Sequence, residues 1–264
     1  MPQVEIIDEA TPPERFFDFV HAIAASFCGT ESTSPGGGFD WTMGQENRPP
    51  GGRLFEPLPG PCGAARLAYF THNALIVATH ARPHGGCVML CDDGHADAAI
   101  LAGAVCHPPG VPHHPDHAEF RAIRSQIAPA PDMGPNARAR GVAMGVANDR
   151  LSQTKLAVGE LWSGSRPHWH VAFLATDPRQ QQRRGFGRML LQWIVERANA
   201  ASVELILETV GPRNQGFYES AGFECLAKTG AITARLQDGN TDTFEEHGGV
   251  SFMVRHPTPN SSRL

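Results

Sequence analysis

The segment from residue 168 to residue 200 constrains the fold of this chain more than any other part of the sequence. An apolar run that favours a β-strand covers residues 168–175, and helical periodicity begins at Gly185 and Gly187 after an arginine-rich loop. Glycines let a backbone approach a ligand closely, and the first amides of a helix have no partner inside the helix. Because the helix dipole adds partial positive charge there, this strand–loop–helix pattern predicts a turn that binds an anion.

Hydrophobic periodicity predicts further elements on both sides of this segment. Helical spacing favours helices over residues 13–28, 62–81, 117–127, 137–157 and 213–221. Apolar and alternating runs favour strands over residues 4–7, 86–91, 98–105, 203–208, 223–235 and 249–255. The sequence Asp92-Asp93-Gly94 is typical of a hairpin turn. This order of elements describes an α/β protein with one mixed sheet.

The pattern has no clean domain boundary, so we expect a single domain over residues 1–256 and a C-terminal tail over residues 257–264. Loop insertions are expected at about residues 29–61, which are rich in Gly, Pro and Ser, and at about residues 106–117, which are rich in Pro and His. The first stretch is too long for an ordinary connection. If its Trp41, Phe39 and Phe55 are buried it forms an ordered lid, and otherwise it is disordered.

Composition excludes several classes of protein. The 264 residues include 22 basic and 27 acidic side chains, a net charge of −5, whereas a nucleic-acid surface needs a basic stripe. A hydrophobic content of 41% supports a core, and no run reaches the ~18 apolar residues of a membrane span. The N-terminus lacks a signal-peptide pattern, and the six cysteines are scattered. We therefore expect a cytoplasmic protein with reduced thiols and with no nucleic-acid or membrane partner.

Two blocks of the sequence resemble a known family. The first runs from Gln182 through Gly185 and Gly187 after a strand, and the second contains Leu207-Glu208-Thr209, Pro212-Arg213-Asn214, Phe217-Tyr218-Glu219 and Gly222-Phe223. Together they resemble the GNAT acetyltransferase superfamily, and within it the puromycin N-acetyltransferase-like members, over about residues 168–256. The resemblance implies a mostly antiparallel central sheet of about seven strands, flanked by helices and splayed at the cofactor site. Similar sequences usually have Gln-Gly where this chain has Gln182-Arg183.

The same resemblance implies acetyl-CoA as cosubstrate. The diphosphate would bind the backbone of the turn, and the pantetheine and acetyl groups would contact the main chain of the preceding strand. Asn214 has a second possible role, because an amide side chain at this position can also cap the following helix. The expected cofactor-binding residues are Leu174, Ala175, Thr176, Gln182, Arg183, Arg184, Gly185, Phe186, Gly187, Arg188, Asn214 and Phe217.

The resemblance also implies direct attack by an amine of a small molecule on the thioester, in a ternary complex. Tyr218 is the candidate general acid, since a phenol matches the basicity of an alkyl thiolate, and its alternative is a core aromatic residue. Glu208 is the preferred general base, and His168 and His170 are alternatives on one face of their strand. Trp41 and His170 are candidate acceptor contacts, with Phe39 and Phe244 as weaker ones. A non-catalytic acyl-CoA sensor is the alternative function.

A histidine-rich loop raises a further possibility. His107, His113, His114 and His117 lie among prolines, and clustered imidazoles can bind zinc or nickel. However, the chain has no nearby cysteine pair and no His-Glu-x-x-His sequence, and the prolines are typical of an exposed loop. We therefore expect no metal. The sequence leaves the acceptor undefined and is compatible with a monomer or a homodimer.

Overall fold

A computed structural model describes residues 2–27, 61–92, 98–113, 117–152, 156–162, 165–176, 185–245 and 248–258. The expected insertion around Trp41 and the loop with Gln182, Arg183 and Arg184 lie outside these ranges. None of the helices in the described ranges is long and apolar enough to cross a membrane.

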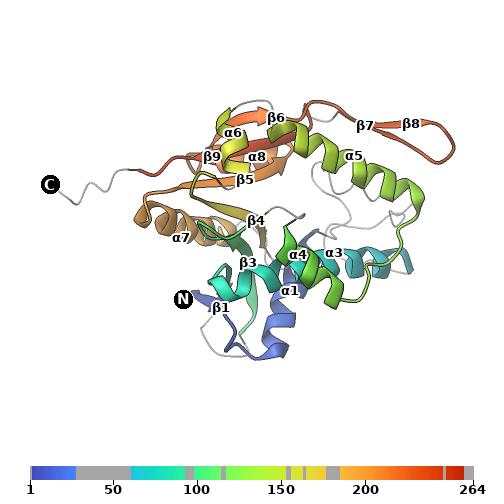
Figure 1. Cartoon of the computed structure of the whole chain (residues 1–264). Coiled ribbons are helices and arrows are strands. Elements are labelled where there is room, and N and C mark those ends of the chain that lie inside the picture. Colours follow the sequence, from blue (N-terminus) through green and yellow to red (C-terminus); the bar gives the residue numbers. More distant parts are fainter. Residues whose placement is uncertain are drawn as a thin grey trace.

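The elements appear in nearly the expected order along the chain (Figure 1). The first half contains β1 (Gln3–Ile7), α1 (Pro13–Phe27), α3 (Pro61–Ala81), a 3-10 turn η2 (Arg82–His84), β2 (Cys87–Cys91), β3 (Ile100–His107), α4 (Ala118–Gln126) and α5 (Pro135–Ser152). The second half contains α6 (Leu156–Trp162), β4 (His168–Thr176), α7 (Phe186–Ala200), β5 (Glu204–Val210), α8 (Pro212–Glu219), β6 (Glu224–Lys228), β7 (Ile232–Arg235), β8 (Thr241–Phe244) and β9 (Val250–Arg255).

The central sheet has seven strands in the order β1-β2-β3-β4-β5-β9-β6, which confirms the expected fold class. All described neighbours pair antiparallel except β4 and β5, which are parallel. A parallel pair needs a crossover, and α7 supplies it. The two strands pair only over His168–Val171 and Glu204–Leu207, although β4 continues to Thr176 and β5 to Val210. Beyond that point the sheet is forked, as the family resemblance implies.

Helices cover both faces of the sheet. On the face that we call the α7 face, the apolar side of α7 packs with strand residues such as Leu205, Leu207 and Met253, and α8 extends the same layer. On the opposite face, which we call the α1 face, Phe19 and Ile23 of α1 pack over β2–β4 together with α3. Further along this second face, α6 covers β5 and β9.

Two expected elements are divided in the structure. The single helix expected over residues 137–157 is two helices, because α5 packs against the β7–β8 pair while Val158 and Leu161 of α6 pack on the central sheet. One straight helix cannot face both partners. The strand expected over residues 223–235 is also divided, because Gly230 adopts a positive φ of 73° between β6 and β7. The second piece then pairs with β8.

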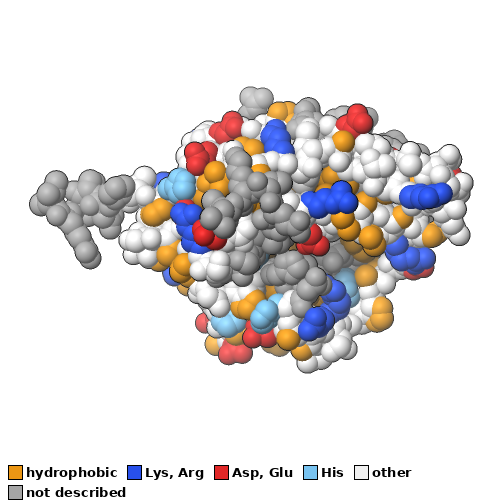
Figure 2. All heavy atoms as spheres, turned by 45° about the horizontal axis from the view of Figure 1, so that its top comes forward, with side chains coloured by type: hydrophobic (Ala, Val, Ile, Leu, Met, Phe, Trp, Pro, Cys, Tyr) orange, Lys and Arg blue, Asp and Glu red, His pale blue; other side chains and the backbone are white. Residues whose placement is uncertain are grey.

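The β7–β8 hairpin extends away from the central sheet beside α5 (Figure 1). Phe244, a weaker candidate acceptor contact, is only 3% exposed there and packs with Ile232 and Val250, so this expectation is replaced by a core role. Figure 2 shows apolar side chains between Lys and Arg side chains over this part of the surface, where Val142 and Val146 are exposed. This surface lies away from the fork.

Replacing Gly86 with Ala is expected to destabilise the fold by about 1–3 kcal/mol, the usual cost of overpacking a core position. Gly86 precedes β2, and a Cβ atom there would lie 2.0 Å from the Cys106 carbonyl oxygen of the neighbouring strand β3. Urea unfolding followed by circular dichroism measures the effect. The matched control is Gly145→Ala in the middle of α5, where a Cβ meets nothing within 4 Å and helix propensity predicts a gain of up to about 1 kcal/mol. Equal midpoints for the two variants would contradict the expectation.

Candidate active site

The fork between β4 and β5 is the centre of the candidate site. In the pairing of β3 with β4, Cys106 faces Val171 and Val105 faces Phe173, so Ala172 is an extra residue that forms a β-bulge in β4. The bulge lies immediately after the last pair between β4 and β5. No strand in the described part of the chain pairs with the β5-facing edge of β4 beyond Val171. That edge is therefore open to an extended ligand.

The start of α7 lies beside the end of β4. Gly185 precedes the helix with a left-handed φ of 75°, and a Cβ on Gly187 would lie 3.0 Å from the Thr176 hydroxyl oxygen. The first intrahelical bond is donated by the Met189 amide to the Gly185 carbonyl, so the amides before it point out of the helix. Outward-pointing amides at a helix start are what an anion-binding turn requires, and anion binding here stays a prediction.

Two side chains of this turn have structural roles. The Phe186 ring is only 8% exposed and belongs to the core under α7, so a ligand at the turn would meet its amide and not its ring. The Arg188 guanidinium donates to the carbonyl and hydroxyl oxygens of Ser220, at 3.1 and 3.3 Å. Arg188 therefore ties the start of α7 to the end of α8.

Tyr218 projects from α8 into the layer on the α7 face. Its ring contacts Phe217 and Phe223, with centroids 5.1 and 5.6 Å away. Burial raises the pKa of the Tyr218 phenol, and the neighbouring Cys106 thiol raises it further. The phenol is thus protonated throughout the usual assay range, as a proton donor must be.

The prediction that Asn214 caps the following helix is wrong. The cap position of α8 is Gly211, and Asn214 lies inside the first turn of the helix. Its side-chain amide donates to the Val210 carbonyl at 3.1 Å and so joins the end of β5 to α8.

His170 and Glu208 meet at the point where the strands separate. His170 pairs with Ile206 across the parallel ladder, so Glu208, two residues further along β5, lies diagonally opposite on the same face. The His170 Nε2 and the Glu208 Oε2 are 2.9 Å apart, and the two side chains are 8% and 20% exposed. If Nε2–H donates to the carboxylate, the lone pair of Nδ1 is left to accept a proton. Glu208 and His170, which the sequence offered as alternative general bases, therefore form one hydrogen-bonded pair.

Other histidines surround this pair on the α1 face. The His107 ring stacks on the His170 ring with centroids 5.6 Å apart and an angle of 13°, and the His113 ring lies 4.5 Å from His170 and 5.0 Å from His168. His168 donates through Nδ1–H to the Arg166 carbonyl oxygen, 2.7 Å away. Burial lowers the pKa of His107 strongly, helped by repulsion from His170 and His80, and burial also lowers the pKa of His168. Burial thus favours the neutral form of His107 and of His168.

The expectation of an exposed histidine loop is wrong for two of its members. His107 ends β3 and His113 packs beside β4, with exposed fractions of 2% and 9%, because both rings turn toward the sheet. His117 is exposed at the start of α4, and His114 lies outside the described residues. Within the described ranges, no group of three or more His, Cys, Asp or Glu side chains is arranged to hold a metal ion.

Comparison with known proteins decides the family. The model of the "Acetyltransferase (GNAT) family" matches residues 54–223, more than half of the chain. The chain belongs to the GNAT acetyltransferase family. It is accordingly an acetyl-transferring enzyme, and the resemblance seen in the two sequence blocks is confirmed. No curated protein matches the chain.

Solved structures of other acetyltransferases share the fold. The arylalkylamine N-acetyltransferase 2 of Aedes aegypti superposes with a TM-score of 0.56 at 13% identity, covering 97% of this chain and 99% of that chain. An agmatine N-acetyltransferase superposes with a TM-score of 0.51 at 14% identity, covering 97% and 100%. At sequence identities this low, the superpositions show that this GNAT enzyme shares its fold with those proteins, and they show the fold alone.

In this acetyltransferase the fork brings together residues from distant parts of the chain. The main chain of Leu174, Ala175 and Thr176 forms the open edge of β4, and Gly185, Phe186 and Gly187 start the helix beside it. Tyr218 lies on the α7 face, where it clusters with Cys106. Successive residues of a strand face opposite sides, so His107 and the His170–Glu208 pair lie on the α1 face. His107 and His80 are members of the cluster that sequence reasoning did not connect with His170.

Proposed function

We propose that this enzyme transfers the acetyl group of acetyl-CoA to an amine of a small molecule by direct attack in a ternary complex. One observation carries the proposal: a hydrogen-bonded His170–Glu208 pair lies at the fork on one face of the sheet, and the protonated phenol of Tyr218 lies on the other. A group held in the fork is thus placed between a proton acceptor and a proton donor. Acetyl transfer to an amine needs both.

In the proposed reaction, His170 accepts a proton from the amine and Tyr218 donates one to the leaving thiolate. As the amine nitrogen bonds to the thioester carbon, His170 Nδ1 takes a proton from the nitrogen, and Glu208 stabilises the imidazolium that forms. The carbon–sulfur bond then breaks, the Tyr218 hydroxyl gives its proton to the leaving thiolate, and the tyrosinate regains a proton from solvent before the next cycle. No covalent bond to the enzyme is formed. This scheme revises the expectation that Glu208 acts alone, since Glu208 here holds the tautomer of the proposed base His170.

The open edge of β4 and the start of α7 are proposed to hold acetyl-CoA. The main chain of Leu174, Ala175 and Thr176 would align the pantetheine arm as a strand would. The outward amides at Gly185–Gly187 would bind the diphosphate, together with Gln182, Arg183 and Arg184 from the loop. Asn214 and Phe217 of α8 would flank the arm on the α7 face.

The acceptor is proposed to enter from the α1 face, where the base lies. The relatives of known structure are named for transfer to arylalkylamines and to agmatine, so a primary amine is the favoured class. Trp41 remains a proposed acceptor contact from the sequence, and it lies outside the described residues. The buried, neutral histidines around His170 would exclude water from the thioester without competing for the amine as charged groups.

A thiol-release assay tests the proposed function. Purified enzyme is incubated with acetyl-CoA and a panel of arylalkylamines, guanidinoalkylamines and polyamines, and each amine is paired with the alcohol of the same skeleton. We expect free CoA and an acetylated amine, identified by mass spectrometry, with at least one amine and little reaction with its matched alcohol. Binding of acetyl-CoA without acceptor-dependent thiol release across the panel would support the sensor alternative.

A further inference from the structure

Three histidines and two carboxylates form a line from the buried fork to the surface. Glu208 contacts His170, the His170 ring stacks on His107, the His107 ring lies 5.4 Å from the His80 ring, and His80 Nε2 contacts Glu119 Oε2 at 3.1 Å. His113 lies beside this line, 6.3 Å from His107 and 4.5 Å from His170. Glu119 is 57% exposed, whereas His80 and His107 are 3% and 2% exposed. The line therefore begins at the proposed base and ends in solvent.

Four nitrogen atoms along this line are buried and lack a hydrogen-bond partner within the part of the chain that the structure describes. Both ring nitrogens of His107, the Nδ1 of His80 and the Nδ1 of His170 have no hydrogen-bond partner among the described residues. Buried polar side-chain atoms are almost always hydrogen-bonded, and internal water serves where protein groups do not. The His107 ring centroid lies 5.4 Å from that of His80 and 5.6 Å from that of His170, so the three rings are successive neighbours. One water molecule between successive rings would complete a continuous chain of hydrogen bonds.

The proposed reaction requires such a path. An acceptor in its ammonium form loses two protons on becoming an amide, and the leaving thiolate takes up one, so one proton must reach solvent in each cycle. His170 receives its proton at a buried nitrogen atom, while the exposed edge of the cluster is at Glu119. A proton left on His170 would block the next cycle, because the base would be occupied.

We propose that His107 and His80 form a proton relay that carries the released proton from His170 through bridging water to Glu119 and solvent. The inference rests on the proposed function of His170. Each ring gains a proton on one nitrogen and loses one from the other, and a flip of the imidazole then returns each ring to its starting tautomer. Burial lowers the pKa of His107 and of His80, so each ring releases its proton readily. The titratable groups that face the line are His113, His168, His84 and His117, together with Glu208 and Glu119 at its ends.

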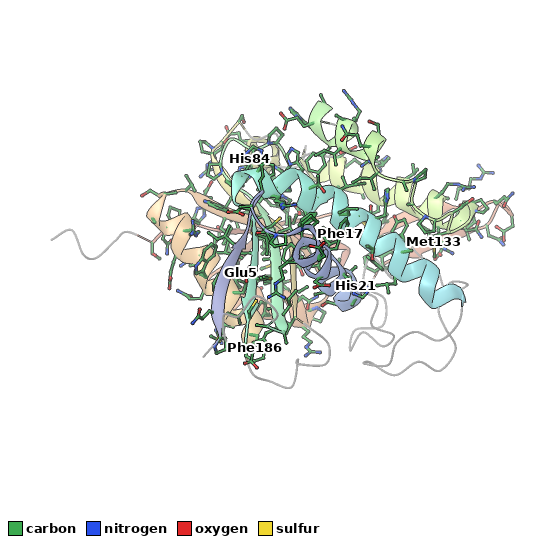
Figure 3. The ribbon with its side chains drawn as sticks, turned by 90° about the horizontal axis from the view of Figure 1, so that it is seen from below. Glu5, Phe17, His21, His84, Met133 and Phe186 are labelled. Atoms are coloured by element: carbon green, nitrogen blue, oxygen red, sulfur yellow. The ribbon has the colours of Figure 1, made fainter. Side chains whose placement is uncertain are left out.

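The exit of the line lies at the end of the sheet opposite to the cofactor turn. Figure 3 shows His84, after the end of α3, and Phe186, at the start of α7, at opposite ends of the strands in that view. His84 lies 6.0 Å from His80 and is exposed, so it marks the rim where the line reaches solvent. The proton would thus leave by a route separate from the cofactor.

His107→Phe tests the relay, since it keeps a flat ring for stacking and removes both nitrogen atoms. Thiol release and proton release are followed together in a weakly buffered stopped-flow experiment with a pH indicator. We expect proton release to lag behind thiol release in the variant and kcat to fall at least about 10-fold, less than on removal of the base. The KM for acetyl-CoA and for the amine should be unchanged, and added imidazole should restore part of kcat.

Matched variants separate the relay from a structural role. His72→Phe makes the same substitution on α3, two turns before His80 and outside the line, and should leave kcat unchanged. His107→Gln keeps hydrogen bonding without a titratable nitrogen, so its proton release should lag behind thiol release as in His107→Phe. This variant also tests the relay if His107→Phe fails to fold. Full kcat and synchronous proton release in His107→Gln would overturn the relay while leaving the acetyl transfer in place. Failure of the wild-type enzyme to acetylate any amine would instead overturn the proposed function.

Discussion

Replacing His170 with Asn should lower kcat by about 10²- to 10⁴-fold, the usual contribution of a positioned general base. Asn has no basic nitrogen and is too short to reach the position of Nε2, so proton abstraction is lost together with the contact to Glu208. The cofactor edge of β4 lies beyond the bulge at Ala172, so the affinity for acetyl-CoA should change little. Initial rates of thiol release give kcat, and titration calorimetry gives the affinity.

Glu208→Gln completes a double-mutant cycle with this variant. If Glu208 acts only by holding the tautomer of His170, its removal should matter in the wild-type background and be nearly silent in His170→Asn, because residues that act as a unit are not additive. Additive losses would mean that Glu208 takes the proton itself, as the sequence alone favoured. A His170→Asn variant with wild-type kcat would remove the pair from the mechanism.

Tyr218→Phe is expected to lower kcat by about 10²-fold or more, because the leaving thiolate loses its proton donor. The variant keeps the ring that packs on Phe217 and Phe223, so the fold and the affinity for acetyl-CoA should be preserved. Since burial raises the pKa of the wild-type phenol, deprotonation of Tyr218 should cause no loss of rate up to about pH 10, the ordinary phenol pKa. The measurement is kcat as a function of pH for both enzymes.

The leaving group provides the sharper comparison for Tyr218. A thioester whose thiol is more acidic than CoA needs less help from a general acid, so the difference between wild type and Tyr218→Phe should shrink with such a donor. Tyr69→Phe on α3 makes the same change in the other tyrosine of the chain and should be silent. An equal loss with both donors would show that Tyr218 supports packing and does not donate a proton.

The sequence was most informative where local pattern and fold agree. The order of β4, α7 and β5 could be predicted because hydrophobic periodicity and the glycines at Gly185 and Gly187 report local geometry. Tyr218 could be named because it lies within a motif of the same local unit. The family, the seven-stranded sheet and the fork follow from these blocks.

The histidine cluster could not be predicted in the same way. His107 and His170 are far apart in the sequence and become neighbours only through the pairing of β3 with β4. His80 comes from a helix whose orientation is set by packing on α1 and β3. Prolines around His113 suggested exposure, whereas its ring turns inward against β4. Contacts of this kind depend on strand register and packing, which residue spacing does not encode.

The short parallel ladder between β4 and β5 links ligand binding to the assembly of the base. If the ladder were extended by one pair, Glu208 would lie beside Ala172 within the sheet and its diagonal approach to His170 would be altered. A ligand lying along the open edge of β4 would prevent this closure, so we expect occupancy of the fork and the geometry of the His170–Glu208 pair to favour each other. By thermodynamic linkage, a change that strengthens the pair should tighten acetyl-CoA binding by the same free energy with which acetyl-CoA strengthens the pair.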